Sequence, residues 1–206
     1  MPYEREPWVQ QLRSGAFPRL GKAAVGTSLL GVAGLVGGIL LLPRFAPLPW
    51  FCVVLALGLA VGGWVLRRAD RAAVARARAW TEQPSLFVPV SRAYRGELPT
   101  FGVPVERGDQ PRLWTADAIG LHAWDGARAD PVAEITWEQI DDFEPEERKT
   151  FTGQSAWALG IRGAGGARLG LSCRRALGSP VGASATRTDI LMRVLRSEAG
   201  RRRQGS

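Results

Sequence analysis

Cysteine and histidine are scarce in this sequence. Its 206 residues include two cysteines, Cys52 and Cys173, and a single histidine, His122. The cysteines lie far apart in segments of different character, so neither an intramolecular disulfide nor a CxxC zinc site is predicted. With no cysteine or serine motif to pair with, His122 is not expected to be a general base. We expect it at the surface, on the polar face of a strand.

Catalytic motifs are also missing. The chain contains no GxSxG, no Walker loop and no HExxH. The GAGG of residues 163–166 lies between two predicted strands rather than before a helix, which a dinucleotide fingerprint requires. The sequence therefore predicts no enzyme activity, no catalytic residue, no bound cofactor and no metal ion.

Apolar sequence, in contrast, is plentiful, at 46% of the chain, and much of it falls in two runs. Residues 24–42 contain no charge and only Thr27 and Ser28 as polar side chains. Residues 48–66 contain no charged residue and no serine or threonine. A helix rises about 1.5 Å per residue, so each run can cross the ~30 Å hydrocarbon core of a bilayer. We predict a transmembrane helical hairpin over residues 24–66. Two buried core helices would need a larger protein around them, and a cleaved signal peptide would begin nearer the start.

Basic residues flank this hairpin unequally. Arg44 is alone in the connecting loop, whereas arginine and lysine precede the first run within residues 1–23 and follow the second. This asymmetry predicts a multi-pass protein of the plasma membrane with both termini in the cytoplasm. The arginines after the second run either set this topology alone or also contact anionic lipid headgroups. They are Arg67, Arg68, Arg71, Arg76 and Arg78.

Two GxxxG pairs, one in each run, allow helices to approach closely. They are Gly34 with Gly38 and Gly58 with Gly62. Small residues at this spacing would pack the hairpin or support a homo-oligomer. Glycine is also common in membrane helices for other reasons, so both interpretations stay open.

The chain after the membrane changes character several times. Residues 67–83 are rich in helix formers and predict a helical extension of the second span. Residues 84–111 contain several prolines and predict a linker with short strands, of which 86–90 is the strongest. Whether this linker joins the following domain is left open by the sequence.

From residue 112 the apolar residues alternate with period two, which is typical of strands with one buried face. Glycines in residues 162–168 predict a hairpin, and residues 125–130 predict another turn. A C-terminal amphipathic helix is expected, capped by Thr186 with Asp189 at its third position and ended by Gly200. A basic tail, residues 200–206, follows.

The order TADAIGLHAW, turn, EITWEQIDDFE, two strands around GAGG and a closing helix resembles the bacterial pleckstrin-homology-like (PH-like) domain. The matching motif residues are Ile119, Gly120, Leu121, Trp137 and Ile140. The resemblance covers residues 112–199 and implies a partly open barrel of two packed antiparallel sheets, closed by the C-terminal helix. It implies no catalysis. In the 125–130 loop, Asp125 and Asp130 flank Arg128, a pattern that does not favour a phosphate site.

Five carboxylates crowd residues 141–147, namely Asp141, Asp142, Glu144, Glu146 and Glu147. Hard cations bind several oxygens, but this run lacks the glycine of a calcium loop. We therefore expect a solvated turn that keeps the domain soluble and repels an anionic membrane.

Taken as a whole, the sequence predicts a non-catalytic, membrane-anchored PH-like module that contacts a protein or lipid headgroups under the cytoplasmic face. The alternative is a membrane-tethered nucleic-acid-binding protein, suggested by the formal net charge of +8 and by Arg201, Arg202 and Arg203. The basic residues gather beside the membrane and at the terminus rather than among exposed aromatics, which favours the first interpretation.

Overall fold

The structure is a computed structural model that describes residues 2–18, 47–81, 84–93, 95–104, 111–149 and 155–203. The α-helices in these ranges are α1 (Pro7–Arg13), α3 (Pro47–Trp80) and α4 (Ala185–Arg203). The strands are β1 (Leu86–Ala93), β2 (Leu113–Ala116), β3 (Gly120–Trp124), β4 (Ala133–Thr136), β5 (Ile140–Lys149), β6 (Ser155–Gly163) and β7 (Arg168–Cys173). Short 3-10 helices are η1 (Pro2–Arg5), η3 (Arg95–Phe101), η4 (Trp137–Gln139) and η5 (Ala164–Gly166).

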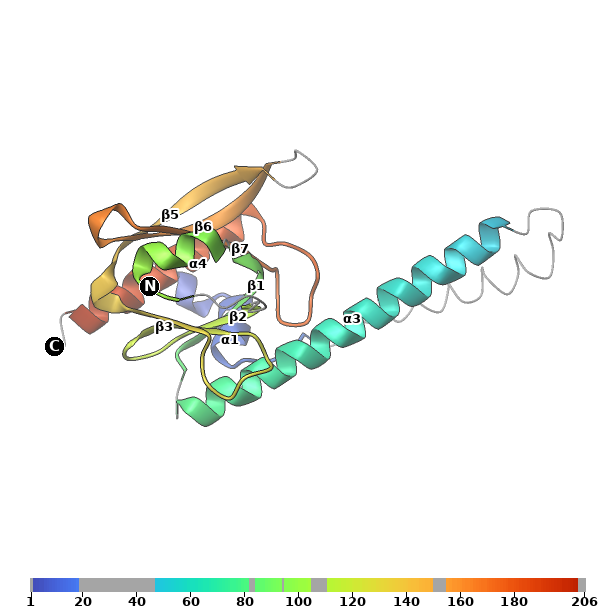
Figure 1. Cartoon of the computed structure of the whole chain (residues 1–206), viewed down its shortest axis with the longest axis horizontal. Helices are drawn as coiled ribbons and strands as arrows, with labels where there is room; N and C mark the ends of the chain where they lie inside the picture. The colour runs from blue at the N-terminus through green and yellow to red at the C-terminus, as the bar shows by residue number, and fades with distance from the viewer. Residues whose placement is uncertain are drawn as a thin grey trace.

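The strands form one open antiparallel sheet in the order β4-β3-β2-β1-β7-β6-β5 (Figure 1). The central strand, β1, pairs with β2 along its first part and with β7 along its last part. The register shifts between Val90 and Arg92, where the partner changes, and such an irregularity lets a strand bend from one layer to another. We call β1–β4 the first half of the sheet and β5–β7 the second half. Together with α4 they form a mainly-β sandwich.

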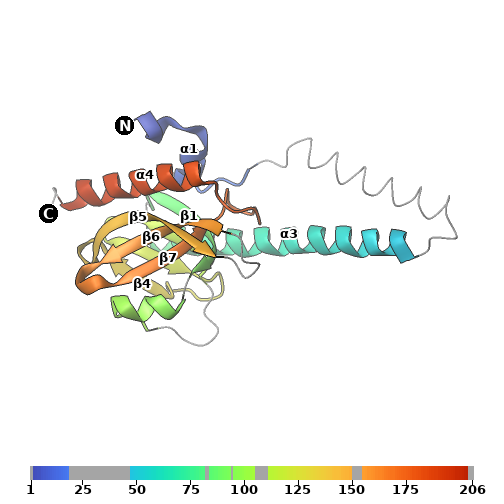
Figure 2. The ribbon, with the colours of Figure 1, turned by 90° about the horizontal axis from the view of Figure 1, so that it is seen from above.

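The main core lies between these two halves. It contains Trp114, Leu121 and Ile135 from the first half, and Phe143 and Leu159 from the second. The helices α4 and α1 complete this core through one apolar stripe each. These stripes are Leu191, Met192, Val194, Leu195 and Ala199 in α4, and Val9 and Leu12 in α1. Figure 2 shows α1 beside α4, with both chain ends at the same end of the molecule.

A second apolar cluster lies on the outer face of the first half of the sheet. Here Ala73, Val74 and Ala77 of α3 pack against Phe87, Leu113 and Trp124 of the strands. Positions i, i+1 and i+4 of a helix lie on one side, so α3 places one narrow stripe of small side chains on the sheet. Trp80 meets Trp124 edge to face, with ring centroids 6.3 Å apart. Strands β2 and β3 are therefore covered on both faces.

Several sequence predictions for this domain are confirmed. The alternating residues Ala133, Ile135 and Trp137 are buried together, and Ile140 is fully buried. The turn of residues 125–130 is closed by the Asp125 side chain, whose Oδ1 accepts hydrogen bonds from the backbone N–H groups of Ala127 and Arg128. Gly165 and Gly166 take φ values of +70° and +84° in the hairpin between β6 and β7.

Other predictions need correction. The short strand expected at residues 86–90 is present as part of β1, but residues 86–93 form the central strand of the sheet rather than part of a linker, so the folded unit begins before residue 112. Proline is unusual in a central strand. Pro89 lies at the last pair of β1 with β2, next to the residues where β1 changes partner, and a missing N–H is tolerated there. The C-terminal helix begins at Ala185 rather than after Thr186, and it continues through Gly200 to Arg203.

The predicted membrane spans fall largely outside what is described. The first run, residues 24–42, lies wholly outside the described residues. The backbone of the second run, residues 48–66, forms the start of α3, and its side chains are described from Val61 onward. Within the described ranges no helix has both the length and the apolar content that a membrane span needs. One helix does run without interruption from Pro47 to Trp80, as the predicted helical extension requires.

Candidate functional site

The candidate site is the place where α3 joins the domain, because residues from both sides of the two apolar runs meet there. Arg67 of α3 donates a hydrogen bond from Nη2 to the carbonyl oxygen of Pro18, at 2.7 Å. About three turns further on, Arg78 donates from Nη2 to the carbonyl oxygen of Ser14, at 2.6 Å. Between them, the Arg71 guanidinium lies 5.5 Å from the ring centroid of Phe17. Residues 14–18 therefore lie along α3.

The rest of the N-terminal segment is packed into the domain. Val9 is 1% exposed and belongs to the main core, as does Leu12. Arg13 of this segment donates from Nη2 to Oε1 of Glu198 in α4, at 3.0 Å. Arg201 contacts both Glu198 and Glu4, at 2.9 and 3.0 Å. Residues 2–18 thus form one folded unit with the chain that follows residue 66.

A buried ion pair joins α3 to the domain. Asp70 is fully buried and accepts two hydrogen bonds from Arg174, at 2.7 and 2.8 Å. The N–H of Gly178 donates to the same carboxylate at 2.7 Å, and Arg174 also reaches the carbonyl oxygen of Arg112 at 3.0 Å. Breaking such a pair leaves an unpaired charge in the interior. Asp70 with Arg174 therefore fixes α3 against the end of β7.

Two loops pack against α3 near this pair. One is residues 125–130, where a Cβ added at Gly126 would lie 3.0 Å from the carbonyl oxygen of Ala69. The other is residues 174–184, where a Cβ added at Gly178 would collide with Arg67. Both glycines have positive φ, +81° and +71°. The two loops hold the helix closely because these positions carry no side chain.

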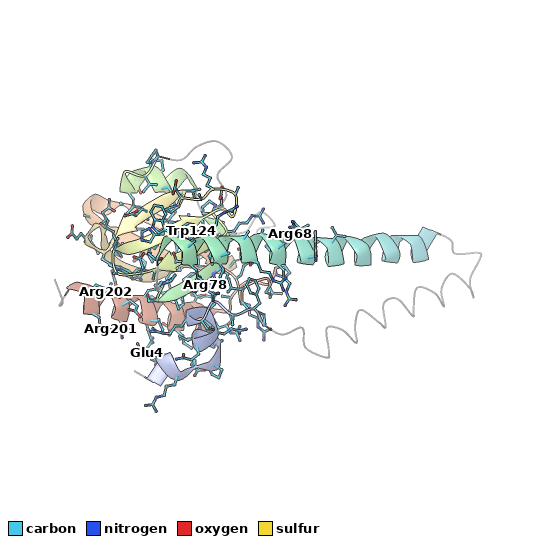
Figure 3. The ribbon with its side chains drawn as sticks, turned by 90° about the horizontal axis from the view of Figure 1, so that it is seen from below. Glu4, Arg68, Arg78, Trp124, Arg201 and Arg202 are labelled. Atoms are coloured by element: carbon cyan, nitrogen blue, oxygen red, sulfur yellow. The ribbon has the colours of Figure 1, made fainter. Side chains whose placement is uncertain are left out.

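The five arginines predicted to contact lipid all belong to α3, but they do not form a free basic surface. Arg67 is half-buried and, like Arg78, binds backbone carbonyls of residues 14–18. Arg76 is half-buried, and its Nη1 has no hydrogen-bond partner among the described residues. Arg68 is exposed and lies 5.5 Å from the ring centroid of Trp64, which is 61% exposed (Figure 3). Arg68 and Arg71 are thus the exposed arginines of this set that make no hydrogen bond to the described part of the domain, although Arg71 lies over the Phe17 ring.

The predicted helix-packing glycines have no contact in the described part of the chain. Gly34 and Gly38 lie outside the described residues. Gly58 and Gly62 belong to α3, and a Cβ added at either would meet nothing within 4 Å among the described residues. Their role in packing stays a prediction.

Neither the protein-family models, nor the curated proteins, nor the solved structures contain a match to this chain. The site is therefore judged by its own geometry.

His122 is not at the surface, contrary to the sequence prediction. It is 1% exposed, with Nε2 3.0 Å from Oδ2 of Asp117 and Nδ1 3.5 Å from Oε2 of Glu134. The prediction failed because His122 shares the face of β3 that also carries Trp124, and this outer face is covered by the second apolar cluster. A polar residue on such a face must find partners within the protein.

Asp117 organises the turn between β2 and β3. Its Oδ1 accepts the N–H groups of Ile119 and Gly120 at 2.8 and 3.2 Å. Burial raises the pKa of Asp117, but the interaction with His122 and these backbone donors outweigh it, and the pKa lies below its ordinary value. Gly120 of the predicted motif is required here, since an added Cβ would collide with the carbonyl oxygen of Ile135. We interpret this group as structural.

The acidic segment also differs from prediction. Residues 141–147 lie in β5, a ten-residue edge strand, and not in a turn. Three of the five carboxylates pair with arginine: Asp142 with Arg196, Glu144 with Arg162, and Glu146 with Arg148. Because their charge is largely balanced, repulsion from an anionic membrane is not supported for these three. No group of three or more His, Cys, Asp or Glu side chains suited to a metal ion occurs in the described ranges.

The ion pair between Asp70 and Arg174 was not predicted from the sequence. One signal was present, since Asp70 is the single acidic residue of the arginine- and alanine-rich segment 67–80. An acid in that position, among so many bases, points to a specific partner. The partner itself could not be chosen among the many arginines of the domain without the fold.

Proposed function

We propose that this chain is a non-catalytic, membrane-anchored interaction module, in which a PH-like domain is held at the cytoplasmic face by a two-span hairpin. Its work is to contact a protein or lipid headgroups beside the membrane. The proposal has three parts, which are the anchoring, the side of the membrane and the interaction role, and each has separate support.

The packing of residues 2–18 carries the anchoring part. Arg67 and Pro18 are hydrogen-bonded, so the segment of residues 19–66 leaves the folded unit and returns to it at one place. Because both ends of this segment are attached to one folded unit, they lie on the same side of a membrane, and the segment crosses that membrane an even number of times or not at all. The two uncharged runs at 24–42 and 48–66 each have the length of one crossing. Two crossings therefore suit both the apolar pattern and the packed ends.

The cytoplasmic side is supported by charge. Arg13, Arg67, Arg68 and Arg71 lie beside the two ends of this segment, whereas Arg44 is the single charge between the runs. Excess arginine in short flanking segments is retained in the cytoplasm. Trp64 next to Arg68 is the combination of aromatic and basic side chains found at membrane interfaces.

The PH-like part rests on the resemblance and on the arrangement of the strands. Four strands followed by three, with a C-terminal helix in the core, agree with what the resemblance implies. Trp137 and Ile140, the two apolar residues of the expected W-x-x-I step, are both buried. Domains of this kind act through surfaces rather than catalytic groups, and we propose the same here.

Nucleic-acid binding receives less support. Arg201, which is part of the basic tail, is paired with Glu198 and Glu4. Figure 3 shows Arg201 and Arg202 at the end of the molecule away from Arg68, so the basic residues are divided between two places. A continuous basic surface would be expected of a nucleic-acid-binding protein.

Extraction of native membranes with alkaline carbonate tests the anchoring. The full-length chain is expected to stay with the membrane pellet. A variant with Leu35→Arg and Leu57→Arg should move to the supernatant, because each charge at the centre of a span costs roughly 2.5–3.5 kcal/mol. The control adds the same charges to exposed residues of the domain, Ile119→Arg and Trp157→Arg, and should remain in the pellet. Release of the unaltered chain would contradict the proposal.

Crosslinking in native membranes followed by affinity purification tests the interaction role. The full chain is compared with a chain that ends at Arg78 and so keeps the hairpin and the arginines of α3. Partners lost with the domain would define its role. Nucleic acid among them would favour the alternative function, and identical partners for both chains would contradict an interaction role for the domain.

A further inference from the structure

The loop of residues 174–184, between β7 and α4, is a second candidate for contact with the membrane. Val181 in this loop is 57% exposed. The loop is not loose, because the N–H of Arg175 donates to the carbonyl oxygen of Val181 at 2.8 Å, and the N–H of Ala183 to that of Cys173 at 2.9 Å. Leu177 is buried in the cluster beneath α3. Val181 is thus held outward by a closed backbone.

Two arginines lie close to each other at this loop. Arg175, whose backbone N–H binds the carbonyl oxygen of Val181, is exposed. Arg187 at the start of α4 is half-buried, lies 5.4 Å from the ring centroid of Trp8, and donates from Nη1 to the carbonyl oxygen of Arg175 at 3.2 Å. Neither arginine forms an ion pair with a described carboxylate. Burial and the nearby charge of Arg175 lower the pKa of Arg187, as expected for two cations held close together. An anion beside these two cations would offset their mutual repulsion.

The position of the loop decides which anion is available. Gly178 of this loop touches Arg67, close to the point where α3 leaves the domain towards residues 47–66. In Figures 1 and 2 the loop lies beside α3, and the free end of α4 points to the other side of the molecule. If residues 48–66 enter a bilayer, the loop faces the headgroups of that same bilayer. An exposed valine in a loop that also carries the exposed Arg175 suits the boundary of phosphates and acyl chains.

We infer that Val181, Arg175 and Arg187 form a membrane-contact surface that binds the anionic phosphates of the bilayer in which the hairpin is anchored. The inference rests on the proposed membrane anchor and adds a second point of attachment to it. Because Asp70 and Arg174 fix α3 to the domain, two points of contact set the tilt of the whole domain over the membrane. The side of the domain away from this loop is then turned to the cytoplasm.

A fluorescent probe at residue 181 tests this surface in the full-length chain. The background variant carries Cys52→Ser. Cys173 is retained, since it is buried and burial raises its pKa to about 12, which prevents labelling of the folded protein. An environment-sensitive dye is attached to Val181→Cys. The matched control is Ile119→Cys, whose native side chain is 55% exposed in the turn between β2 and β3.

The proteins are placed in vesicles of phosphatidylcholine alone or with an equal part of phosphatidylglycerol, and carbonate extraction first verifies insertion. We expect blue-shifted emission, quenched by spin-labelled lipid, at residue 181 in the anionic vesicles and no change at residue 119. Replacing both arginines, with Arg175→Gln and Arg187→Gln, should shift the contact equilibrium about fivefold per arginine towards the free orientation. The charge-matched control, Arg168→Gln with Arg202→Gln, should leave the signal unchanged.

Each other result counts against the inference. Equal signals at residues 181 and 119 in inserted protein would overturn the membrane-contact surface and leave the anchor standing. An equal blue shift in vesicles without phosphatidylglycerol would overturn the role of anionic phosphate. Failure of the unaltered chain to insert would overturn the anchor and this surface together.

Discussion

The two halves of the sheet are built from similar strands but meet different surroundings. All residues of β2 and β3 in the first half are buried, because the main core covers one face and α3 covers the other. In β5 of the second half, Phe143 is buried while its neighbours Asp142 and Glu144 remain half-exposed and pair with arginines. The helix that leads to the predicted membrane spans is the cause of the difference.

In β2 and β3 of the first half of the sheet, polar side chains are buried and paired within the protein, whereas along β5 of the second half they remain in contact with water. In the first half, His122 is enclosed by carboxylates, and Trp124 donates from Nε1 to Oγ1 of Thr115 at 2.8 Å. In the second half, charged pairs along β5 are open to water and to salt. The same chemical groups should therefore contribute very differently to stability, and four sets of variants measure that difference.

Two tryptophans give the largest expected contrast. Trp124→Ala should lower the free energy of unfolding by about 3–5 kcal/mol, because it empties the cluster under α3. Trp157→Ala, at a residue that is 44% exposed in β6, should cost less than about 1 kcal/mol. Urea unfolding of the purified full-length chain, followed by circular dichroism, measures both. Equal losses would show that α3 does not seal the first half.

The buried ion pair of Asp70 with Arg174 gives the next largest effect. The exposed pair of Asp142 with Arg196, described below, is compared with it. Asp70→Asn keeps the shape of the side chain but leaves Arg174 unpaired in the interior, which should cost about 3 kcal/mol. A double variant, Asp70→Leu with Arg174→Met, should recover much of this loss, since no unpaired charge remains. Thermal unfolding of the three proteins compares them. A double variant less stable than Asp70→Asn would contradict this interpretation.

The pKa of Asp117 predicts a loss of stability in acid. Its folded pKa lies below the usual value of 3.8, so its stabilising effect is complete above that pH and disappears as the pH falls through the folded pKa. The difference in free energy of unfolding between the wild type and Asp117→Asn should be largest near neutral pH and should narrow in acid. Urea titrations at several pH values measure it. A difference independent of pH would argue against ionised Asp117 in the folded protein.

The exposed pair of Asp142 with Arg196 should give the smallest effect. Its side chains are 46% and 43% exposed, although the geometry is bidentate, with distances of 2.7 and 2.8 Å. A double-mutant cycle with Asp142→Asn and Arg196→Gln should give a coupling of about 0.2–1 kcal/mol. Salt should reduce this coupling, whereas the loss of stability caused by Asp70→Asn should respond little. A coupling as large as that loss would contradict the contrast.

Much of the sheet could be predicted from the sequence. Alternation identified β3, β4, β6 and β7, and glycine patterns placed the turns at 125–130 and 162–168 correctly. The core residues Ile135, Trp137 and Leu159 followed from the same period. These successes depend on local pattern, which survives without knowledge of the fold.

The remainder depends on which elements pack together, and local pattern does not carry that information. His122 was misplaced because nothing in β3 reveals that α3 covers its outer face. The strand at residues 86–90 was predicted, but it was assigned to a linker because of the surrounding prolines, and its place at the centre of the sheet could not be seen from local pattern. The pairing of Asp70 with Arg174 spans 104 residues, and the packing of residues 14–18 on Arg78 spans 64 residues. The same limit applied to the candidate site, since it is made of such distant contacts.

The central claim is that residues 2–18 and the chain after residue 66 form one unit on the cytoplasmic side, with a hairpin in the membrane between them. Single cysteines at Arg5, Arg44 and Arg202, in the Cys52→Ser background, test it in spheroplasts with a membrane-impermeant maleimide. Arg5 and Arg202 are both exposed on the folded unit. The account predicts labelling at residue 44 in intact spheroplasts, and at residues 5 and 202 only after permeabilisation. Labelling of residue 5 or 202 in intact spheroplasts would contradict it.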